Sequence, residues 1–199
     1  MFKRKDVVKW LSGNLKKTRF DHVMGVLNVA VELAEVHGVS KEKAETAALF
    51  HDYAKNFSDE EMLTHIENEN LYDDNLSVCD SLNLYHGIVG ARIAEKEYGI
   101  DDSDILNAII NHTFGRVGMS KLEKIIYLSD MMEASRNFEG VEEIRKIAFL
   151  DLDKAMIVAI DKTLIYLIGR GEAININTIC ARNDLLAASE KGTVKKGGV

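Results

Sequence analysis

The sequence contains no proline among its 199 residues, and its apolar residues recur at helical spacing. Proline breaks or kinks a helix from within, so its absence leaves long helices uninterrupted. Strict alternation of apolar and polar residues, which is typical of a half-buried strand, is not sustained anywhere. The clearest helical stripe lies within residues 20–36 and consists of Val23, Val26, Leu27, Ala30, Leu33 and Ala34. These patterns predict an all-α helical bundle.

Capping residues and glycines mark the expected helix ends. Gly38 is a C-terminal stop for the first stripe, and Ser40 is an N-cap for a helix expected over residues 41–53. The segments "SDEE" at 58–61 and "SKLE" at 120–123 are capping boxes that open two further helices. Other helices are expected over residues 86–98, 103–113, 141–149, 151–168 and 177–189, and a first helix over about 4–17 with an interruption near Gly13.

The chain length suits a single domain with a substantial core. No internal repeat or low-complexity linker divides it, so residues 1–190 are expected to form one domain. Residues 191–199 are Gly-rich and charged, and are expected to be a flexible tail. Residues 68–84 are the least regular part and are expected to form a long loop. The hydrophobic fraction of 46% and the charged fraction of 29% are ordinary for a globular protein.

Several features predict a cytoplasmic protein. No apolar run approaches the ~20 residues that span a membrane. The N-terminus "MFKRKDVVKW" is basic but lacks the apolar segment and cleavage site of a signal peptide. Cys79 and Cys180 are far apart, without a CxxC pattern, and are expected to be free buried thiols in a reducing compartment.

The net charge of −7, with scattered acidic residues, argues against a nucleic acid as the partner. A small phosphorylated substrate remains compatible with this charge, because metals and a few local basic residues can serve one pocket. No membrane partner is expected. A homodimer is the expected assembly only because symmetric dimers are the commonest oligomers.

The segment "ALFHDYAKN", residues 48–56, sets His51 beside Asp52 directly after an apolar run. Adjacent residues on a helix point about 100° apart, so this doublet is not a helical salt bridge. Either the doublet lies at an exposed helix end, or the interior of the fold requires both groups.

Other ionisable residues also lie on apolar helix faces. Asp130 follows Leu122 and Ile126 at helical spacing, and an isolated carboxylate in an apolar seam is costly unless it is paired or binds a cation. A lone helix histidine is usually a satisfied core or cap residue, and Asp130 alone could be a salt-bridge partner. One shared metal centre nevertheless explains six residues together: His22, His51, Asp52, His86, His112 and Asp130. His37, in a last helical turn, and His65, among acidic residues, are excluded.

Imidazole and carboxylate ligands without thiolate suit iron, manganese, cobalt or zinc. Six ligands exceed the number that one catalytic ion needs, so two divalent ions bridged by Asp52 are expected. His22, His51 and Asp130 would hold the first ion, and His86 and His112 the second. Two ions about 3.5–4 Å apart can activate a water and stabilise both oxygens of a phosphoryl displacement.

The order of His22, His51-Asp52 and Asp130 resembles that of the HD-domain metal-dependent phosphohydrolases. From about Arg19 to Asp184, a longer series of segments is similar to the YqeK family of bacterial symmetrical bis(5′-nucleosyl)-tetraphosphatases. These segments are "RFDHVMGV", "LFHDYAK", "HGIVGA", "DILNAIINHTFG", "MSKLEKIIYLSDMMEASR" and "ICARND". The family usually has proline after its final aspartate, where this chain reads Glu133-Ala134-Ser135-Arg136 and keeps the arginine.

The resemblance implies an HD-type metallohydrolase domain, a di-iron-type centre, and hydrolysis of diadenosine tetraphosphate to two ADP. The expected reaction is attack of a metal-bound water on an inner phosphate. Four phosphates call for additional positive charge near the ions. Asp52, Lys55 and Arg136 are therefore expected to be catalytic, and the expected phosphate-binding residues are Arg19, Lys55, Arg116, Arg136 and Arg182.

Two alternatives remain open from the sequence. Another HD-type nucleotide phosphohydrolase, either a nucleotidase or a cyclic-nucleotide phosphodiesterase, would use the same ions with a different pocket. A non-catalytic nucleotide-binding HD protein usually lacks some ligands, and none of the six is missing here. A purely structural bundle leaves Asp130 and four histidines without a purpose.

Overall fold

The computed structural model describes residues 3–72 and 82–194, and the described residues form ten α-helices and one short 3-10 helix without any strand. The elements are α1 (Arg4–Asn14), α2 (Lys17–His37), α3 (Lys41–Phe50), α4 (Asp59–Glu69), η1 (Leu82–Tyr85), α6 (His86–Tyr98), α7 (Ser103–Asn111), α8 (Lys121–Met132), α9 (Val141–Ala148), α10 (Leu152–Arg170) and α11 (Ile176–Val194). The all-α prediction is confirmed. No helix in this part of the chain is both long enough and apolar enough to cross a membrane.

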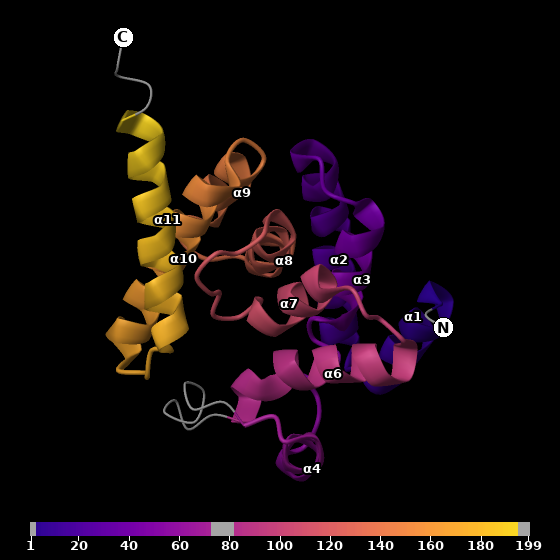
Figure 1. Cartoon of the computed structure of the whole chain (residues 1–199). Coiled ribbons are helices and arrows are strands. Elements are labelled where there is room, and N and C mark those ends of the chain that lie inside the picture. The colour runs from indigo at the N-terminus through magenta and orange to yellow at the C-terminus, as the bar shows by residue number, and fades with distance from the viewer. Residues whose placement is uncertain (1–2, 73–81, 195–199) are drawn as a thin grey trace.

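Helix α8 lies at the middle of the bundle (Figure 1). It packs against α2, α3 and α7 on one side and against α9 and α10 on the other. Its side chains Leu122, Ile125, Ile126, Leu128 and Met132 are almost completely buried. Asp130 lies on this helix, so its carboxylate is close to several other helices at once.

Most sequence-predicted helix ends agree with the structure. Both capping boxes form, with Ser58 and Ser120 accepting from the backbone N–H three residues later. The first helix ends at Asn14, one residue after Gly13, and a second helix begins at Lys17. Within the expected 68–84 loop, α4 continues to Glu69 and η1 begins at Leu82.

The predictions of a loop over 68–84, of a buried thiol at Cys79 and of a C-terminal tail concern residues that lie partly outside the described structure. Residues 73–81, which include Cys79, lie outside it. Cys180 is a free thiol, and it is only partly buried. The tail expected from residue 191 begins inside α11, which continues to Val194; residues 195–199 lie outside the described part.

The helix expected over residues 41–53 ends earlier, at Phe50. From His51 onward the backbone forms tighter turns, in which Tyr53 N donates to Phe50 O and Lys55 N donates to Asp52 O. The predicted C-terminal end of this helix, residue 53, is therefore three residues too late. His51 itself keeps helical backbone angles, and its N–H donates to Ala47 O, so the α-helical hydrogen bonds end only after this residue.

Two glycines allow α6 to approach its neighbours closely. A Cβ at Gly90 would lie 2.9 Å from the carbonyl oxygen of Phe50, and a Cβ at Gly87 would lie 2.8 Å from that of Ile109. Any larger residue at either position would push α6 away from the ends of α3 and α7. The two glycines thus explain how His86, the first residue of α6, comes to lie near His51 and His112.

Candidate metal centre

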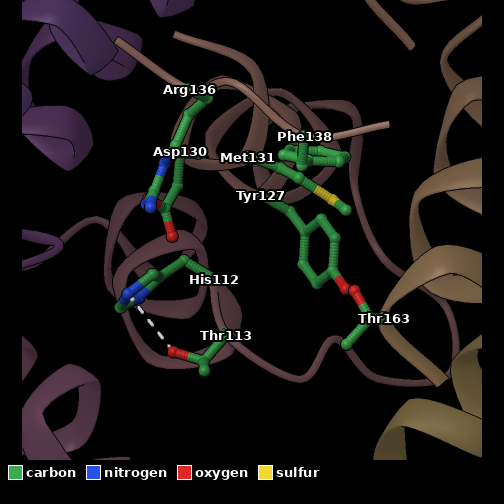
Figure 2. A pocket seen from close by; sticks show the side chains of 8 residues that line it. All are labelled: His112, Thr113, Tyr127, Asp130, Met131, Arg136, Phe138 and Thr163. Carbon is green, nitrogen blue, oxygen red and sulfur yellow. Dashed lines mark hydrogen bonds and ion pairs between the residues drawn. The ribbon is translucent and has the colours of Figure 1, made fainter. Parts of the chain in front are cut away.

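A cavity of about 220 Å³, called the central cavity below, lies between the end of α7, α8 and α10. Figure 2 shows Asp130, Arg136, His112 and Thr113 along one side of it and the Tyr127 ring with Thr163 along the other. Met131 and Phe138 complete the lining. The cavity thus places a carboxylate, an imidazole and a guanidinium at the same opening.

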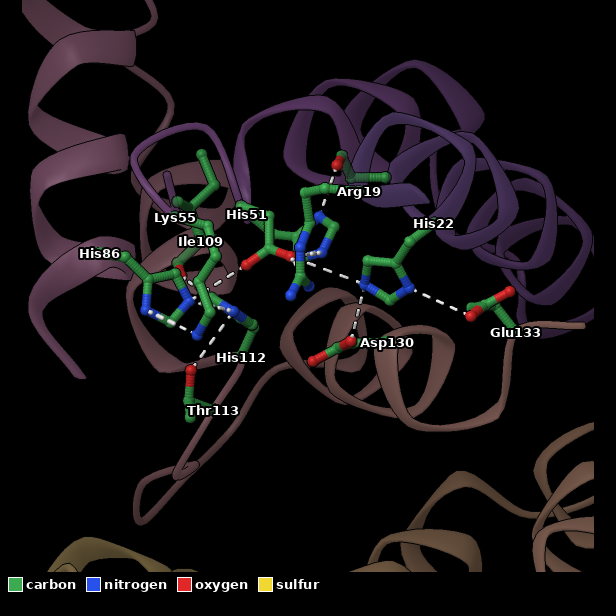
Figure 3. Close-up of polar contacts among 12 residues, drawn as sticks. Arg19, His22, His51, Lys55, His86, Ile109, His112, Thr113, Asp130 and Glu133 are labelled. Atoms are coloured by element: carbon green, nitrogen blue, oxygen red, sulfur yellow. Dashed lines mark hydrogen bonds and ion pairs between the residues drawn. The ribbon is translucent and has the colours of Figure 1, made fainter. Parts of the chain in front are cut away.

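All six sequence-predicted metal ligands lie close together, and two of them, His112 and Asp130, line this cavity. Figure 3 labels five of the six, all except Asp52. They come from α2, the turn after α3, the start of α6, the end of α7, and α8. They form two groups, and within each group the ligand atoms lie within 4.8 Å of one another. The first group is His22, His51 and Asp130, and the second is Asp52, His86 and His112. Each group offers three nitrogen or oxygen ligands to one ion.

Asp52 lies between the two groups. Its Oδ1 is 3.3 Å from Nε2 of His86, and its Oδ2 is 3.5 Å from Nε2 of His51 and 3.6 Å from Nε2 of His22. Asp130 Oδ1 is 3.1 Å from Nε2 of His22. One carboxylate with each oxygen facing a different group is the arrangement that a bridging ligand requires.

The four histidines are oriented through their Nδ1 atoms. His51 and His112 each donate over 2.7 Å to the carbonyl three residues earlier, and His86 donates to the carbonyl three residues earlier as well. Nδ1 of His22 lies 3.1 Å from Oε1 of Glu133. Since carbonyl and carboxylate oxygens only accept, Nδ1 carries the hydrogen in each ring. In the neutral form of each ring, which is the form that binds a metal ion, Nε2 therefore presents its lone pair to the centre.

Nε2 of His112 lies 3.3 Å from the Thr113 hydroxyl, which can donate to it, whereas the other three lone pairs have no hydrogen-bond donor in these tautomers among the described residues. Nε2 of His22 and of His51 are buried without a hydrogen bond. Nε2 of His86 and of His112 lie 3.0 Å apart, and in these tautomers no hydrogen lies between them. Burial, and then the neighbouring His86 and His51, lower the pKa of His112 to about 3, so its ring stays neutral. Neutral imidazoles and carboxylates without thiolate fit divalent transition metals.

Both carboxylates remain ionised at neutral pH. Burial acts to raise the pKa of Asp52, but the nearby His51 and His86 outweigh it and hold this pKa well below the usual range. Burial also opposes ionisation of Asp130, but contact with the His22 imidazole, whose Nε2 lies 3.1 Å from Oδ1, outweighs burial and lowers the pKa of this carboxyl. The centre therefore supplies negative charge to balance bound cations.

Three of the five expected phosphate-binding residues lie at this centre. Arg19 Nη1 donates to Asp52 Oδ2 over 2.7 Å, and Arg136 Nη2 donates to Asp130 Oδ1 over 2.5 Å. Lys55 Nζ lies 3.4 Å from Nδ1 of His86, and burial lowers the pKa of this lysine. The structure thus brings positive charge to both carboxylates and to the second group of ligands.

The structure does not bring the other two expected residues, Arg116 and Arg182, into contact with the six ligands. The Arg116 guanidinium donates to both oxygens of the buried Glu123 over 2.7 and 2.8 Å. Arg182 is paired with Asp161. Glu123 and Asp161 lie on other elements than the arginines that they pair with, so spacing in the sequence did not reveal these ion pairs.

Replacing Arg116 with alanine is expected to lower the free energy of unfolding by about 1–3 kcal/mol, because Glu123 would keep a buried charge without its main donor. Urea unfolding would measure the loss. Arg4→Ala is the control, since its pair with Glu45 is half exposed and worth under about 1 kcal/mol. Equal effects of the two substitutions would contradict the structural role of Arg116.

Glu133 is a candidate positioning residue that the sequence analysis missed. It is 2% exposed, faces Nδ1 of His22, and is itself held by the backbone N–H and hydroxyl of Ser135. Its position three residues after Asp130 on the same helix face was a signal in the sequence. Gly25 makes room for it, because a Cβ there would lie 2.7 Å from Oε2 of Glu133.

Replacing Gly25 with alanine is expected to weaken metal binding by roughly 10–100-fold, the usual effect of losing an outer partner of a ligand histidine. The added methyl group meets only the end of the Glu133 side chain and displaces its carboxylate from His22, so the fold should be retained. Isothermal titration with Mn²⁺ would measure the change. Gly13→Ala is the matched control, because nothing lies within 4 Å of a Cβ there. Unchanged affinity in Gly25→Ala would rule out this orienting role.

The family model described as HD domain matches residues 19–135, a range that contains all six candidate ligands. The chain therefore belongs to the HD-domain family. A solved structure from Clostridium acetobutylicum is described as that of a predicted HD superfamily hydrolase involved in NAD metabolism. It is 41% identical to this chain with a TM-score of 0.89, and the match covers 94% of this chain and 99% of the other.

Two curated relatives define the narrower group. A protein of Bacillus subtilis (strain 168) is 40% identical over 186 residues, which cover 94% of this chain and 99% of the relative. A protein of Halalkalibacterium halodurans is 41% identical and covers 87% and 91%. Both are named symmetrical bis(5′-nucleosyl)-tetraphosphatase. Within the HD-domain proteins, the chain belongs to this YqeK-type family.

Proposed function

We propose that the protein hydrolyses diadenosine tetraphosphate symmetrically to two ADP, with two divalent ions held by the six residues. The observation that carries this proposal is the convergence of four imidazoles and two carboxylates beside three basic side chains. The names of the relatives at 40% and 41% identity support the substrate and the position of cleavage.

The proposed ligand sets are His22, His51 and Asp130 for one ion and His86 and His112 for the other, with Asp52 as the bridge. Divalent ions in such a site lower the pKa of water towards neutrality and stabilise negative charge on phosphoryl oxygens. Iron is the proposed metal by resemblance to the family, and manganese, cobalt and zinc also suit these ligands.

The basic residues position the polyphosphate. A guanidinium has five N–H donors, of which Arg19 gives one to Asp52 and Arg136 gives two to Asp130, so both have donors left for phosphate oxygens. Lys55 supplies a third positive group, next to His86. The departing ADP is an acceptable leaving group, so a strong general acid is less important. Arg116 and Arg182 remain weaker candidates for substrate contact, because both guanidiniums already pair with carboxylates.

We also propose that residues 1–190 form a single domain, that the protein is cytoplasmic and forms a homodimer, and that it has no nucleic-acid partner. The small phosphorylated substrate supports the last of these, because it needs only the local cluster of basic residues and not a basic face.

Product analysis tests the function. Metal-loaded protein incubated with diadenosine tetraphosphate should yield two ADP per substrate, resolved by ion-exchange chromatography. A panel of nucleoside monophosphates, cyclic nucleotides and NAD provides the comparison. Formation of AMP plus ATP would contradict symmetrical cleavage. An intact tetraphosphate together with cleavage of a monophosphate or a cyclic nucleotide would favour one of the alternative HD activities.

A further inference from the structure

Four residues follow α8 directly, and two of them lie against the candidate metal centre. Residues 133–136 read Glu-Ala-Ser-Arg and are called the post-α8 segment below. Glu133 faces Nδ1 of His22, whereas Arg136 donates to Asp130 and lines the central cavity (Figure 2). The position of this short stretch of backbone therefore decides where a carboxylate and a guanidinium meet the centre.

The post-α8 segment does little to fix its own position. It contains no proline, so no ring fixes a φ angle in it. Its internal hydrogen bonds run from Ser135 to the Glu133 carboxylate and from Arg136 N to Glu133 O. These bonds shape the turn without tying its backbone to a neighbouring helix. Because ordering a backbone costs conformational entropy, a single position of this segment needs a partner outside it.

Arg145 on α9 supplies that partner. Helix α9 packs against α8 (Figure 1). The Arg145 Nε donates to Met132 O over 2.9 Å, and its Nη2 donates to Glu133 O over 2.8 Å and to Arg136 O over 2.9 Å. Its Nη1 pairs with Glu142 on the same helix. The guanidinium thus binds the last residue of α8 and both ends of the post-α8 segment.

These three bonds exceed what the end of a helix requires. The last carbonyls of a helix lack partners within it, and Arg145 meets this need at Met132 and Glu133. The third bond reaches Arg136, beyond the helix. No other side chain from a neighbouring helix donates to the backbone of the post-α8 segment in the described part of the chain. Only 25% of the Arg145 side chain is exposed, so these bonds are largely shielded from water.

We propose that Arg145 is a positioning residue for the polyphosphate. By bonding the backbone at both ends of the post-α8 segment, it holds Arg136 where the guanidinium of Arg136 lines the central cavity. The inference rests on the proposed function for the identity of the substrate. It extends that function to a residue that neither lines the central cavity nor bonds to any of the six candidate ligands.

The two active side chains of the post-α8 segment depend on Arg145 to different degrees. Glu133 directly follows α8, its N–H donates to Ser129 O, and Ser135 holds its carboxylate. Arg136 lies three residues further on, its side chain is 39% exposed, and its carbonyl accepts from Arg145. Loss of Arg145 is therefore expected to weaken phosphate binding while metal binding stays nearly unchanged.

Arg145→Ala tests the proposal through phosphate affinity. Isothermal titration with inorganic phosphate, on Mn²⁺-loaded protein freed of unbound ion, should show a loss of about tenfold, as expected when a hydrogen bond to a charged group is lost. Titration of the metal-free protein with Mn²⁺ should give nearly the wild-type affinity, which also shows that the centre is folded. Lys146→Ala is the matched control, because it removes the same charge from an exposed position one residue later on α9. This control should leave both affinities unchanged.

A double-mutant cycle separates positioning from a general loss of stability. If Arg145 acts through Arg136, adding Arg145→Ala to Arg136→Ala should weaken phosphate binding no further. Arg145→Lys keeps the charge but offers one nitrogen atom to three carbonyls, so a smaller loss in the same direction is expected. The lysine variant takes the place of Arg145→Ala in the cycle if the alanine variant does not fold.

Additive losses in the cycle would overturn the proposal, and so would wild-type phosphate affinity in both Arg145→Ala and Arg145→Lys. Failure of the proposed function has a different signature. In that case diadenosine tetraphosphate would not give two ADP, whereas phosphate affinity would still fall in Arg145→Ala and would fall no further in the double variant than in Arg136→Ala.

Discussion

Replacing Asp52 with alanine is expected to reduce kcat on diadenosine tetraphosphate by roughly 10³-fold or more. Asp52 faces both groups of ligands, with its two oxygens 3.3–3.6 Å from the Nε2 atoms of three histidines. Its loss removes the bridge and with it the charge stabilisation that paired ions supply. That stabilisation is worth several kcal/mol, and each 1.36 kcal/mol is about tenfold in rate. Steady-state kinetics with quantified ADP would measure the loss.

The fold of Asp52→Ala should persist, because the substitution removes a costly buried charge and leaves the surrounding apolar packing in place. Circular dichroism would verify this. Asp21→Ala is the matched control: Asp21 is next to His22 in the sequence, but its side chain is 57% exposed and pairs only with Lys17 in the described structure. Turnover by Asp52→Ala at a rate near that of Asp21→Ala would exclude the proposed centre.

Removal of divalent ions is expected to abolish hydrolysis and to lower the melting temperature. A ligand present at about 100 times its dissociation constant stabilises the native state by about 2.7 kcal/mol. For a chain of this size, that stabilisation corresponds to a shift of roughly 5–10 °C. Dialysis against a chelator followed by addition of Mn²⁺ or Fe²⁺, with activity and melting followed on the same sample, would measure both effects.

His51→Ala provides the specificity control for this experiment. Because His51 is completely buried and its Nε2 has no hydrogen-bond partner in the described structure, its loss removes one ligand of the first ion. The variant should show a much smaller thermal response to added metal. Full activity of the wild-type protein after exhaustive chelation, with no thermal response to metal, would contradict a metal-dependent mechanism.

The sequence predicted the helices, and it also singled out six ionisable residues that the structure brings together, for the same physical reason. Helical spacing shows which residues share a buried face, and ionisable groups such as His22 and Asp130 on such a face require an explanation. The distribution of the ligands over two groups, with Asp52 between them, also agrees with the geometry that the structure shows.

Other features depend on contacts between distant elements, which spacing along the sequence shows weakly or not at all. Glu133 becomes important only because α8 packs beside α2 and Gly25 leaves space for its carboxylate. The role of Gly87 and Gly90 appears only when α6 is seen against Ile109 and Phe50. The pair of Arg116 with Glu123 joins a loop to the start of α8, so the sequence alone left Arg116 available for phosphate.

The central claim is that the six side chains hold two divalent ions in one cavity. Anomalous diffraction from a crystal grown with manganese tests it most directly. The expected result is two peaks about 3.5–4 Å apart, one beside His22, His51 and Asp130 and the other beside His86 and His112, with Asp52 between them. No peak among these residues, or manganese bound only elsewhere on the protein, would contradict the account.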